Sequence, residues 1–167
     1  MLVELKNYLP LNSCINNYMP NNQFKRGELY SVINSMATTA IARRLQKNFR
    51  NAGLEITIEQ WSILYHLWKE NELSQQELCN RTFRDKPSIT RLIDNLEKLK
   101  LVTRTASKTD RRINVVSLTN AAKKLQDITI EIANQTMDEA LHNVSKSEIE
   151  TVKSVFQKVY DNLINLT

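Results

Sequence analysis

The chain has 167 residues, of which 41% are apolar and 25% are charged, so a single domain with a buried core is expected. With only two glycines and three prolines, it lacks the residues for many tight turns or a glycine-rich phosphate loop, which argues against an all-β or nucleotide-binding fold. Cys14 and Cys79 have no Cys or His partner at metal-ligand spacing, so neither a disulfide framework nor a metal or other cofactor is expected.

Residues 1–27 are expected to form a tether outside the domain. Clusters of Asn, together with Pro10 and Pro20, interrupt every periodicity, and the segment lacks the basic start, apolar core and cleavage site of a secretory signal. No stretch elsewhere approaches the roughly 18 apolar residues that span a bilayer. We therefore expect a cytoplasmic protein that does not contact a membrane.

Two helices are expected next. Apolar residues recur at helical spacing from Glu28 until Gly53, a residue typical of the end of a helix. Residues 57–60 (Thr-Ile-Glu-Gln) have the form of a capping box, in which the Thr hydroxyl and the Gln side chain satisfy free backbone amides. This box opens a second helix that is expected to end near Asn71.

A third and a fourth helix are expected to follow closely. Residues 74–77 (Ser-Gln-Gln-Glu) form a second capping box, and a short helix continues through about Arg81. After a turn at residues 82–84, Asp85 is expected to cap the fourth helix. Pro87 is tolerated in its first turn, because the backbone amide hydrogen that proline lacks would have no partner within the helix there. The apolar stripe of this helix is Ile89, Leu92, Ile93, Leu96 and Leu99.

The remaining chain predicts one β-hairpin and two long helices. Residues 101–105 and 113–118 are rich in Val and Thr, as strands are, and they bracket a polar connection at 106–112; no other β structure is expected. Thr119 caps a long helix, and residues 145–148 (Ser-Lys-Ser-Glu) form a third capping box that opens the last helix.

The net positive charge is confined to the centre of the chain. Residues 74–112 contain ten Lys or Arg against five acidic residues, a net charge of +5 that equals the net charge of the whole chain. Such a patch is either a solvated basic helix face or the footprint of a phosphate-binding surface, and charge alone does not choose between them.

This basic patch coincides with the order helix, turn, helix, β-hairpin. The fourth helix displays, opposite its apolar stripe, short polar and basic groups that suit base edges and phosphates in a major groove. They are Lys86, Pro87, Thr90, Arg91, Asp94, Asn95 and Lys98. For this helix taken alone, an ordinary solvated face is the alternative.

The region resembles the MarR family of bacterial regulators, the multiple antibiotic resistance type. The resemblance is carried by residues 86–98 (Lys-Pro-Ser-Ile-Thr-Arg-Leu-Ile-Asp-Asn-Leu-Glu-Lys) at the recognition-helix position, and by residues 110–112 (Asp-Arg-Arg) and 115–119 (Val-Val-Ser-Leu-Thr) at the wing. With the flanking helices it covers about residues 28–166. It implies a mainly α fold, a winged helix-turn-helix with long N- and C-terminal helices that form a dimerisation region and one small β-hairpin wing.

The resemblance also implies a transcriptional regulator that binds double-stranded DNA in a sequence-specific manner. Ser88, Thr90 and Arg91 would approach the bases. Arg112 would enter the minor groove from the wing tip, braced by Asp110, while the start of the third helix and the other wing cations suit phosphates. The predicted DNA-binding residues are Ser74, Gln75, Gln76, Lys86, Pro87, Ser88, Thr90, Arg91, Asn95, Lys98, Lys108, Asp110, Arg111 and Arg112.

One position departs from the family pattern. The family usually has glycine between the recognition helix and the following strand, where this chain has Lys100. Either Lys100 adopts a left-handed conformation, at a cost of roughly 1 kcal/mol relative to glycine, or the helix ends differently.

The first and last helices are expected to form a homodimer interface. Residues 28–53 and 120–167 would be the dimerisation helices of a single domain spanning 28–167, with residues 57–118 as its DNA-binding lobe. The last helix has too many apolar residues to leave exposed, although an intramolecular helical core is the alternative. They are Phe156, Val159, Tyr160, Leu163 and Ile164. A dimer would place two recognition helices about one turn of DNA apart, on a pseudo-palindromic operator.

The resemblance further implies a ligand-responsive repressor with a small-molecule pocket. Its candidate wall is Arg43, Trp61, Tyr65 and His66, against the alternative that the aromatic residues are ordinary core.

Two other interpretations stay open, a winged helix that binds a protein and a regulator that senses oxidants through a cysteine. The neighbours of Cys14 supply no positive charge to lower its thiol pKa, and Cys79 is expected to be buried. An enzyme is not expected, because no catalytic motif or cofactor fingerprint occurs.

Overall fold

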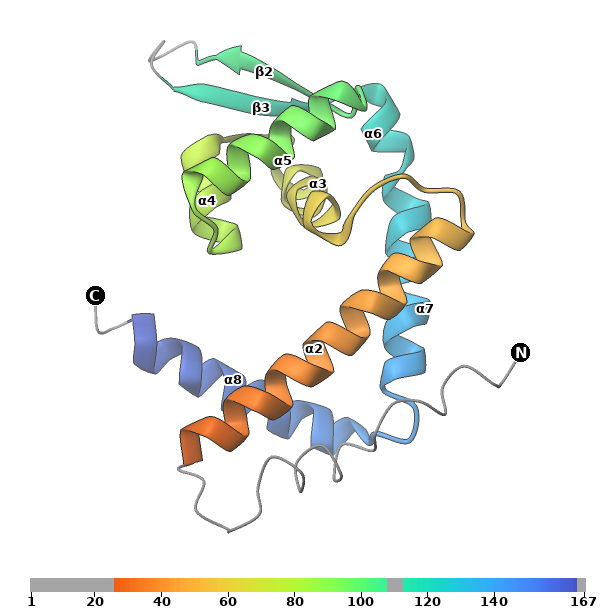
Figure 1. The fold of residues 1–167 in the computed structure, drawn as a ribbon, viewed down its shortest axis with the longest axis vertical. Helices are drawn as coiled ribbons and strands as arrows, with labels where there is room; N and C mark the ends of the chain where they lie inside the picture. The colour runs from red at the N-terminus through yellow and green to blue at the C-terminus, as the bar shows by residue number, and fades with distance from the viewer. Residues whose placement is uncertain (1–25, 108–112, 165–167) are drawn as a thin grey trace.

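The computed structural model describes residues 26–107 and 113–164, and these form a mainly helical structure (Figure 1). The elements in chain order are α2 (Arg26–Asn51), α3 (Ile58–Glu70), β1 (Glu72–Ser74), α4 (Gln75–Thr82), α5 (Lys86–Lys98), β2 (Val102–Ala106), β3 (Asn114–Leu118), α6 (Asn120–Lys124), α7 (Gln126–Ala140) and α8 (Lys146–Ile164). In Figure 1 the helices α3, α4 and α5 gather with the strands into one lobe, and the long helices α2, α7 and α8 lie beside it. The predicted mainly α, winged helix-turn-helix fold is confirmed.

The three predicted capping boxes are confirmed, because their hydrogen bonds form in the structure, whereas the first helix begins at Arg26, two residues before the expected Glu28. At α3, the Gln60 amide donates to Thr57 Oγ1 at 3.2 Å, and the Thr57 amide donates to Gln60 Oε1 at 2.8 Å. The same reciprocal bonds join Ser74 and Glu77 at α4 and the residues 145 and 148 at α8. Each box satisfies amides that a helix N-terminus leaves unpaired.

The expectation of a hairpin as the only β structure is wrong. The short strand β1 pairs with β3, so the sheet has three antiparallel strands in the order β1-β3-β2. Leu73, the middle residue of β1, lies opposite Val116 and is buried. Three residues are too few to show an alternating pattern, and the pairing joins segments more than forty residues apart, so sequence periodicity could not reveal this strand.

The long helix predicted after Thr119 is divided in two. Thr119 caps α6 as predicted, with its Oγ1 accepting from the Ala122 amide at 3.3 Å. Leu125 separates α6 from α7, yet its backbone stays in the right-handed region (φ −81°, ψ −13°). The two helices therefore continue one another, and α7 ends at Ala140, with Leu141 as its C-cap.

The core lies in the lobe and is closed on one side by the end of α2. The buried apolar residues include Leu45 and Phe49 of α2, Ile63, Leu64 and Leu67 of α3, Leu78 of α4, Ile89, Ile93 and Leu96 of α5, and Leu73, Val102 and Val116 of the sheet. Burying these side chains holds α5 against the other elements of the lobe.

The same helix α2 also packs on α7. Arg44 forms an ion pair with Glu139 at 2.6 Å, and Asn48 donates to the Thr136 hydroxyl at 2.9 Å. Because Leu45 and Phe49 of α2 belong to the lobe core, this helix connects the lobe with the long helices.

Lys100 adopts the left-handed conformation, the first of the two alternatives expected from the sequence, with φ of 58°. The Lys100 amide donates to the Glu97 carbonyl oxygen and the Leu101 amide to the Leu96 carbonyl oxygen, both at 2.9 Å. This pair of bonds is a Schellman motif, which usually has glycine at the left-handed position. It ends α5 and turns the chain directly into β2.

α8 stands apart from the core, since none of its residues is buried. The exposed large apolar side chains on it are Val152, Val155, Phe156, Tyr160, Leu163 and Ile164. Within the described chain, α8 does not take part in an intramolecular helical core. In the part of the chain that the structure describes, no helix combines the length and apolar character needed to cross a membrane.

Candidate nucleic-acid interface

The helix α5 has one face in the core and one face outward. Ile89, Ile93 and Leu96 are fully buried. The predicted DNA-binding side chains of this helix lie on the other side, where Lys86, Pro87, Arg91 and Lys98 are exposed and Ser88, Thr90 and Asn95 are half-buried. A helix anchored by its apolar stripe can present cations and short polar groups to a major groove without exposing the core.

Asp85 fixes the start of α5. Its carboxylate accepts from the Ser88 amide at 2.7 Å and from the Ser88 hydroxyl at 3.1 Å, as the predicted cap requires. The bond from the Ser88 backbone, followed by that from its side chain, holds the pKa of Asp85 below its ordinary value. The charged carboxylate therefore stabilises the first turn of the helix.

The three predicted contacts at the start of α4 differ in exposure. Gln76 is exposed and donates to Asn80 at 3.1 Å, and Ser74 is half-buried within its capping box. Gln75 is only 9% exposed, and its side chain bonds to Thr90 at 3.3 Å and to Asn114 at 3.4 Å. In this arrangement the Gln75 side chain lies inside the lobe and braces α5, instead of facing outward toward a phosphate.

Arg104 of β2 binds two carboxylates of α5. Its Nη2 donates to Asp94 and lies 3.1 Å from Glu97 Oε2, and the arginine side chain is mostly buried. Asp94, which the sequence placed on the outward side of α5, is thereby paired with the first strand of the wing. Sequence reasoning gave Arg104 no role, because its partners become neighbours only when β2 packs on α5.

The wing-tip residues predicted to contact DNA, Lys108, Asp110, Arg111 and Arg112, lie outside the described residues. The strands that lead to this tip are described, with Ala106 of β2 opposite Asn114 of β3. The Ser107 amide donates to the Ile113 carbonyl oxygen at 2.8 Å, which extends the hairpin pairing by one step.

The candidate ligand residues form an aromatic cluster on α3, without Arg43. The ring centroids of Trp61 and Tyr65 are 5.5 Å apart, and those of Tyr65 and His66 are 5.9 Å apart. The ring of Trp61 also contacts the buried Phe49, at 6.0 Å. Arg43 lies exposed on α2 and takes part in none of these ring contacts.

Two polar groups of this cluster are affected by burial, the indole nitrogen of Trp61 and the imidazole of His66. Trp61 Nε1 is buried and has no hydrogen-bond partner in the described structure. Burial first, and then the nearby Arg81 and Lys69, lower the pKa of His66. The cluster thus combines core packing with an unsatisfied indole donor.

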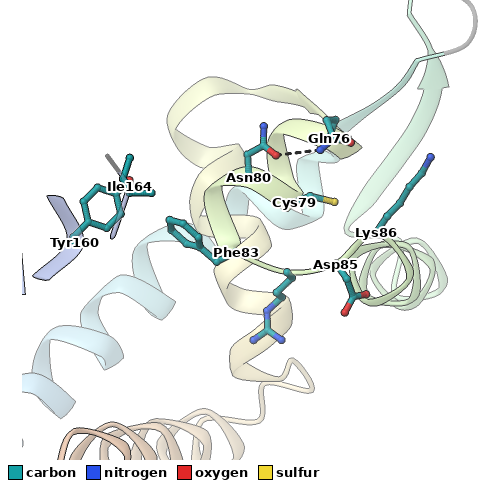
Figure 2. A pocket seen from close by; sticks show the side chains of 9 residues that line it. Gln76, Cys79, Asn80, Phe83, Asp85, Lys86, Tyr160 and Ile164 are labelled. Carbon is teal, nitrogen blue, oxygen red and sulfur yellow. Dashed lines mark hydrogen bonds between the residues drawn. The ribbon is translucent and has the colours of Figure 1, made fainter. Parts of the chain in front are cut away.

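A groove that sequence reasoning missed lies between the α4–α5 turn and the end of α8 (Figure 2). It has a volume of about 570 Å³ and is lined by Gln76, Cys79, Asn80, Phe83, Arg84, Asp85, Lys86, Tyr160 and Ile164. Figure 2 shows Tyr160 and Ile164 on one side of Phe83, whose ring is 6.1 Å from that of Tyr160. Phe83 is 72% exposed and left-handed (φ 53°), an unusual combination for an aromatic residue, and neither property can be read from the sequence.

The two cysteines differ in what the structure says of them. Cys79 is buried and unpaired, as predicted, on the α4 side of the groove. Cys14 lies outside the described residues.

Two helices joined by a turn, with an amphipathic second helix and a hairpin directly after it, define a winged helix-turn-helix protein. The model of the MarR family matches residues 53–113, from the end of α2 to the wing. The winged-helix lobe of this chain is therefore similar to the MarR family, and the resemblance found in the sequence is confirmed.

Solved structures of regulators have the same fold over most of the chain. A MarR transcriptional regulator from Methanosarcina mazei Go1 matches with a TM-score of 0.74 and 21% identity, over 84% of this chain and 99% of its own. A mutant of MarR from E. coli in complex with operator DNA matches with a TM-score of 0.72 and 22% identity, over 86% of this chain and 96% of its own. BpsR from Bordetella bronchiseptica matches with a TM-score of 0.71 and 18% identity, over 79% of this chain and 98% of its own. At these identities the likeness concerns the fold.

Proposed function

We propose that this chain is a transcriptional regulator that binds double-stranded DNA in a sequence-specific manner. The observation that carries the proposal is α5, whose apolar side is fully buried while Lys86, Arg91 and Lys98 extend from its outer side. Cations at this position attract phosphates, and short polar side chains between them can reach base edges. The similar fold of E. coli MarR, solved with operator DNA, supports the same use of the lobe here.

The proposed DNA contacts follow the exposure of the side chains. On α5 they are Lys86, Pro87, Ser88, Thr90, Arg91, Asn95 and Lys98, and on α4 they are Ser74 and Gln76, with Gln75 in a bracing role. The wing tip at residues 108–112 is proposed to contact the minor groove and flanking phosphates, on the resemblance to the family alone.

We further propose that the protein acts as a homodimer. Residues 28–53 and 120–167 would form the dimerisation region and residues 57–118 the DNA-binding lobe. The support is the run of exposed apolar side chains on α8, such as Leu163 at 63%, which a soluble monomer rarely leaves in contact with water. A two-fold dimer would present two α5 helices to a pseudo-palindromic operator.

The proposed mode of action is repression relieved by a small molecule. BpsR, which has a similar fold, is a protein whose DNA binding is regulated by 6-hydroxynicotinic acid. In this chain the aromatic cluster of Trp61, Tyr65 and His66 offers ring stacking and an unsatisfied indole donor, and we retain Arg43 as a candidate anion contact. The role is proposed to be non-enzymatic and cytoplasmic.

Fluorescence anisotropy tests the DNA-binding proposal, with a duplex from upstream of the protein's own gene beside an unrelated duplex at two salt concentrations. The wild type should bind the upstream duplex more tightly, and higher salt should weaken binding as counterion release decreases. Arg91→Ala should weaken binding at least about fivefold, because a base or phosphate contact is lost.

The matched control is Arg50→Ala, which removes an exposed arginine at the end of α2 and should leave DNA affinity unchanged. If no duplex binds even at low salt, the DNA-binding proposal is wrong, and a protein-interaction role for the winged helix becomes the better explanation. If both arginine variants lose affinity equally, α5 is not the recognition helix.

A further inference from the structure

The hydroxyl of Thr90, on the outer side of α5, already has partners within the protein. Thr90 Oγ1 donates to the Lys86 carbonyl oxygen at 2.9 Å and accepts from Gln75 Nε2 at 3.3 Å. A hydroxyl carries a single hydrogen, so a threonine that donates to its own helix has none left to donate to a base.

Gln75 holds this arrangement from inside the lobe. Its side chain is buried, and its Oε1 accepts from Asn114 Nδ2 of β3 at 3.4 Å. One amide therefore joins α4, α5 and the wing strand, and both of its ends are hydrogen-bonded. Disturbing a buried, satisfied amide leaves polar groups unpaired, so the direction of the Thr90 hydroxyl is set before any partner arrives.

The methyl group of Thr90 is the substituent that remains for recognition. Hydroxyl and methyl diverge from the same Cβ, and the hydroxyl is directed to α4 and to the carbonyl one turn back. The Thr90 side chain is half-buried on α5, next to the exposed Arg91. If α5 enters the major groove, the methyl group is the part of the Thr90 side chain that is not committed to a hydrogen bond within the protein.

We propose that Thr90 selects thymine in the operator through contact between its methyl group and the 5-methyl group of the base, with Gln75 as the positioning residue. This inference rests on the proposed function, because it requires α5 to lie in the major groove. Among the four bases only thymine carries a methyl group there, and threonine methyl is a known partner for it. Each operator half-site should therefore contain one thymine opposite Thr90.

The test uses the full chain and the duplex that the wild-type protein enriches from a random library. Each thymine of that duplex is replaced singly by deoxyuridine, which keeps the base-pairing edge and lacks only the methyl group. Affinity for the wild type should fall about fourfold at one thymine in each half-site, the effect of one methyl group no longer buried. All other replacements should have little effect.

Two variants separate the methyl group from the hydroxyl. Thr90→Val keeps the methyl group and should retain the deoxyuridine penalty. Thr90→Ser keeps the hydroxyl and should bind the thymine duplex about fourfold more weakly, with no further loss on deoxyuridine. Thr151 on α8 is the matched control, because its hydroxyl also donates to the carbonyl oxygen four residues earlier, at 2.8 Å. Thr151→Val and Thr151→Ser should leave the penalty unchanged.

The inference is overturned if no thymine shows a penalty with the wild type, if Thr90→Ser keeps the penalty, or if a folded Thr90→Val loses it. Urea denaturation checks that Thr90→Val is folded; if it is not, the comparison of wild type with Thr90→Ser on the two duplexes decides. If the wild type enriches no sequence at low salt, the DNA-binding proposal itself fails and this inference with it. That result is distinct because it involves no Thr90 variant.

Discussion

Single residues at helix ends determine how α5 is presented, and Lys100, which ends α5, is held in a strained conformation. Its φ of 58° suits glycine better than lysine. Lys100→Gly should raise the free energy of unfolding by about 0.5–1 kcal/mol, because relief of the left-handed strain outweighs the greater freedom of glycine in the unfolded chain. Urea denaturation measures the change.

The control for Lys100 is Lys98→Gly, which places glycine in the right-handed last turn of α5. This change should lower the free energy of unfolding by about 0.5–1 kcal/mol, since glycine weakens a helix interior. A destabilising effect at both positions would contradict the argument from strain.

Asp85 makes the stability of the lobe depend on pH. Its pKa is lower in the folded than in the unfolded chain, so the charged carboxylate stabilises the fold. This contribution is complete above the ordinary Asp pKa of about 4 and is lost as the pH falls through the folded pKa. Asp85→Asn, which keeps a capping oxygen without the charge, should lower the urea midpoint at pH 7 and have less effect at pH 3.

The comparison variant for this pH dependence is Asp138→Asn, an exposed carboxylate on α7 outside the lobe. At pH 7 it should lower the urea midpoint less than Asp85→Asn does, because Asp138 accepts no capping bond in the described structure. A difference between wild type and Asp85→Asn that grows as the pH falls would show that the sign of the Asp85 argument is wrong.

Between elements, Arg104 connects β2 with α5 through Asp94 and Glu97. A double-mutant cycle with Arg104→Met and Asp94→Asn should give a coupling energy of about 1 kcal/mol, a moderate value because Asp94 is half exposed. The exposed pair of Lys153 and Glu150 on α8 is the matched comparison and should give roughly 0.3 kcal/mol. Equal coupling energies in the two pairs would contradict the claim that Arg104 holds β2 on α5 more strongly than an exposed surface ion pair would.

The elements that could be predicted from the sequence are those with local signals. The starts of α3, α4, α5, α6 and α8 follow from Ser, Thr or Asp caps whose partners lie three residues away, so a short stretch of chain contains the whole signal. The strand β1 and the break at Leu125 were missed, because one depends on pairing with the distant β3 and the other leaves the backbone helical.

The same distinction applies to the site. Helical periodicity was enough to assign Arg91 and Lys98 to the outer side of α5, because the side of a helix on which a residue lies depends only on its spacing from the apolar residues of that helix. The position of Gln75 was not predictable in this way, since its burial depends on how α4 packs on α5 and β3. The bracing role of Arg104 and the groove beside Phe83 likewise exist only after elements distant in sequence come together.

For the whole molecule, the exposed apolar side of α8 is the feature that supports the proposed homodimer. Leu163→Glu places a charge where a dimer interface would be apolar, and it should convert a dimer into a monomer in sedimentation velocity experiments. Because a monomer contacts only one half-site, its DNA affinity should fall by at least about a hundredfold.

The control on α8 is Lys158→Glu, an exposed charge reversal outside the set of exposed apolar residues on this helix. It should leave the sedimentation behaviour of the dimer unchanged. A wild-type protein that sediments as a monomer at micromolar concentration would contradict the dimer proposal without reference to either variant.

Hydroxyl-radical footprinting of the wild type on its enriched duplex tests the central proposal most directly, because it records both DNA binding and symmetry. Two α5 helices in successive major grooves predict two protected regions related by a two-fold axis and about 10 base pairs apart. Protection of a single region, or none at low salt with folded protein, would contradict the proposal of a dimeric DNA-binding regulator.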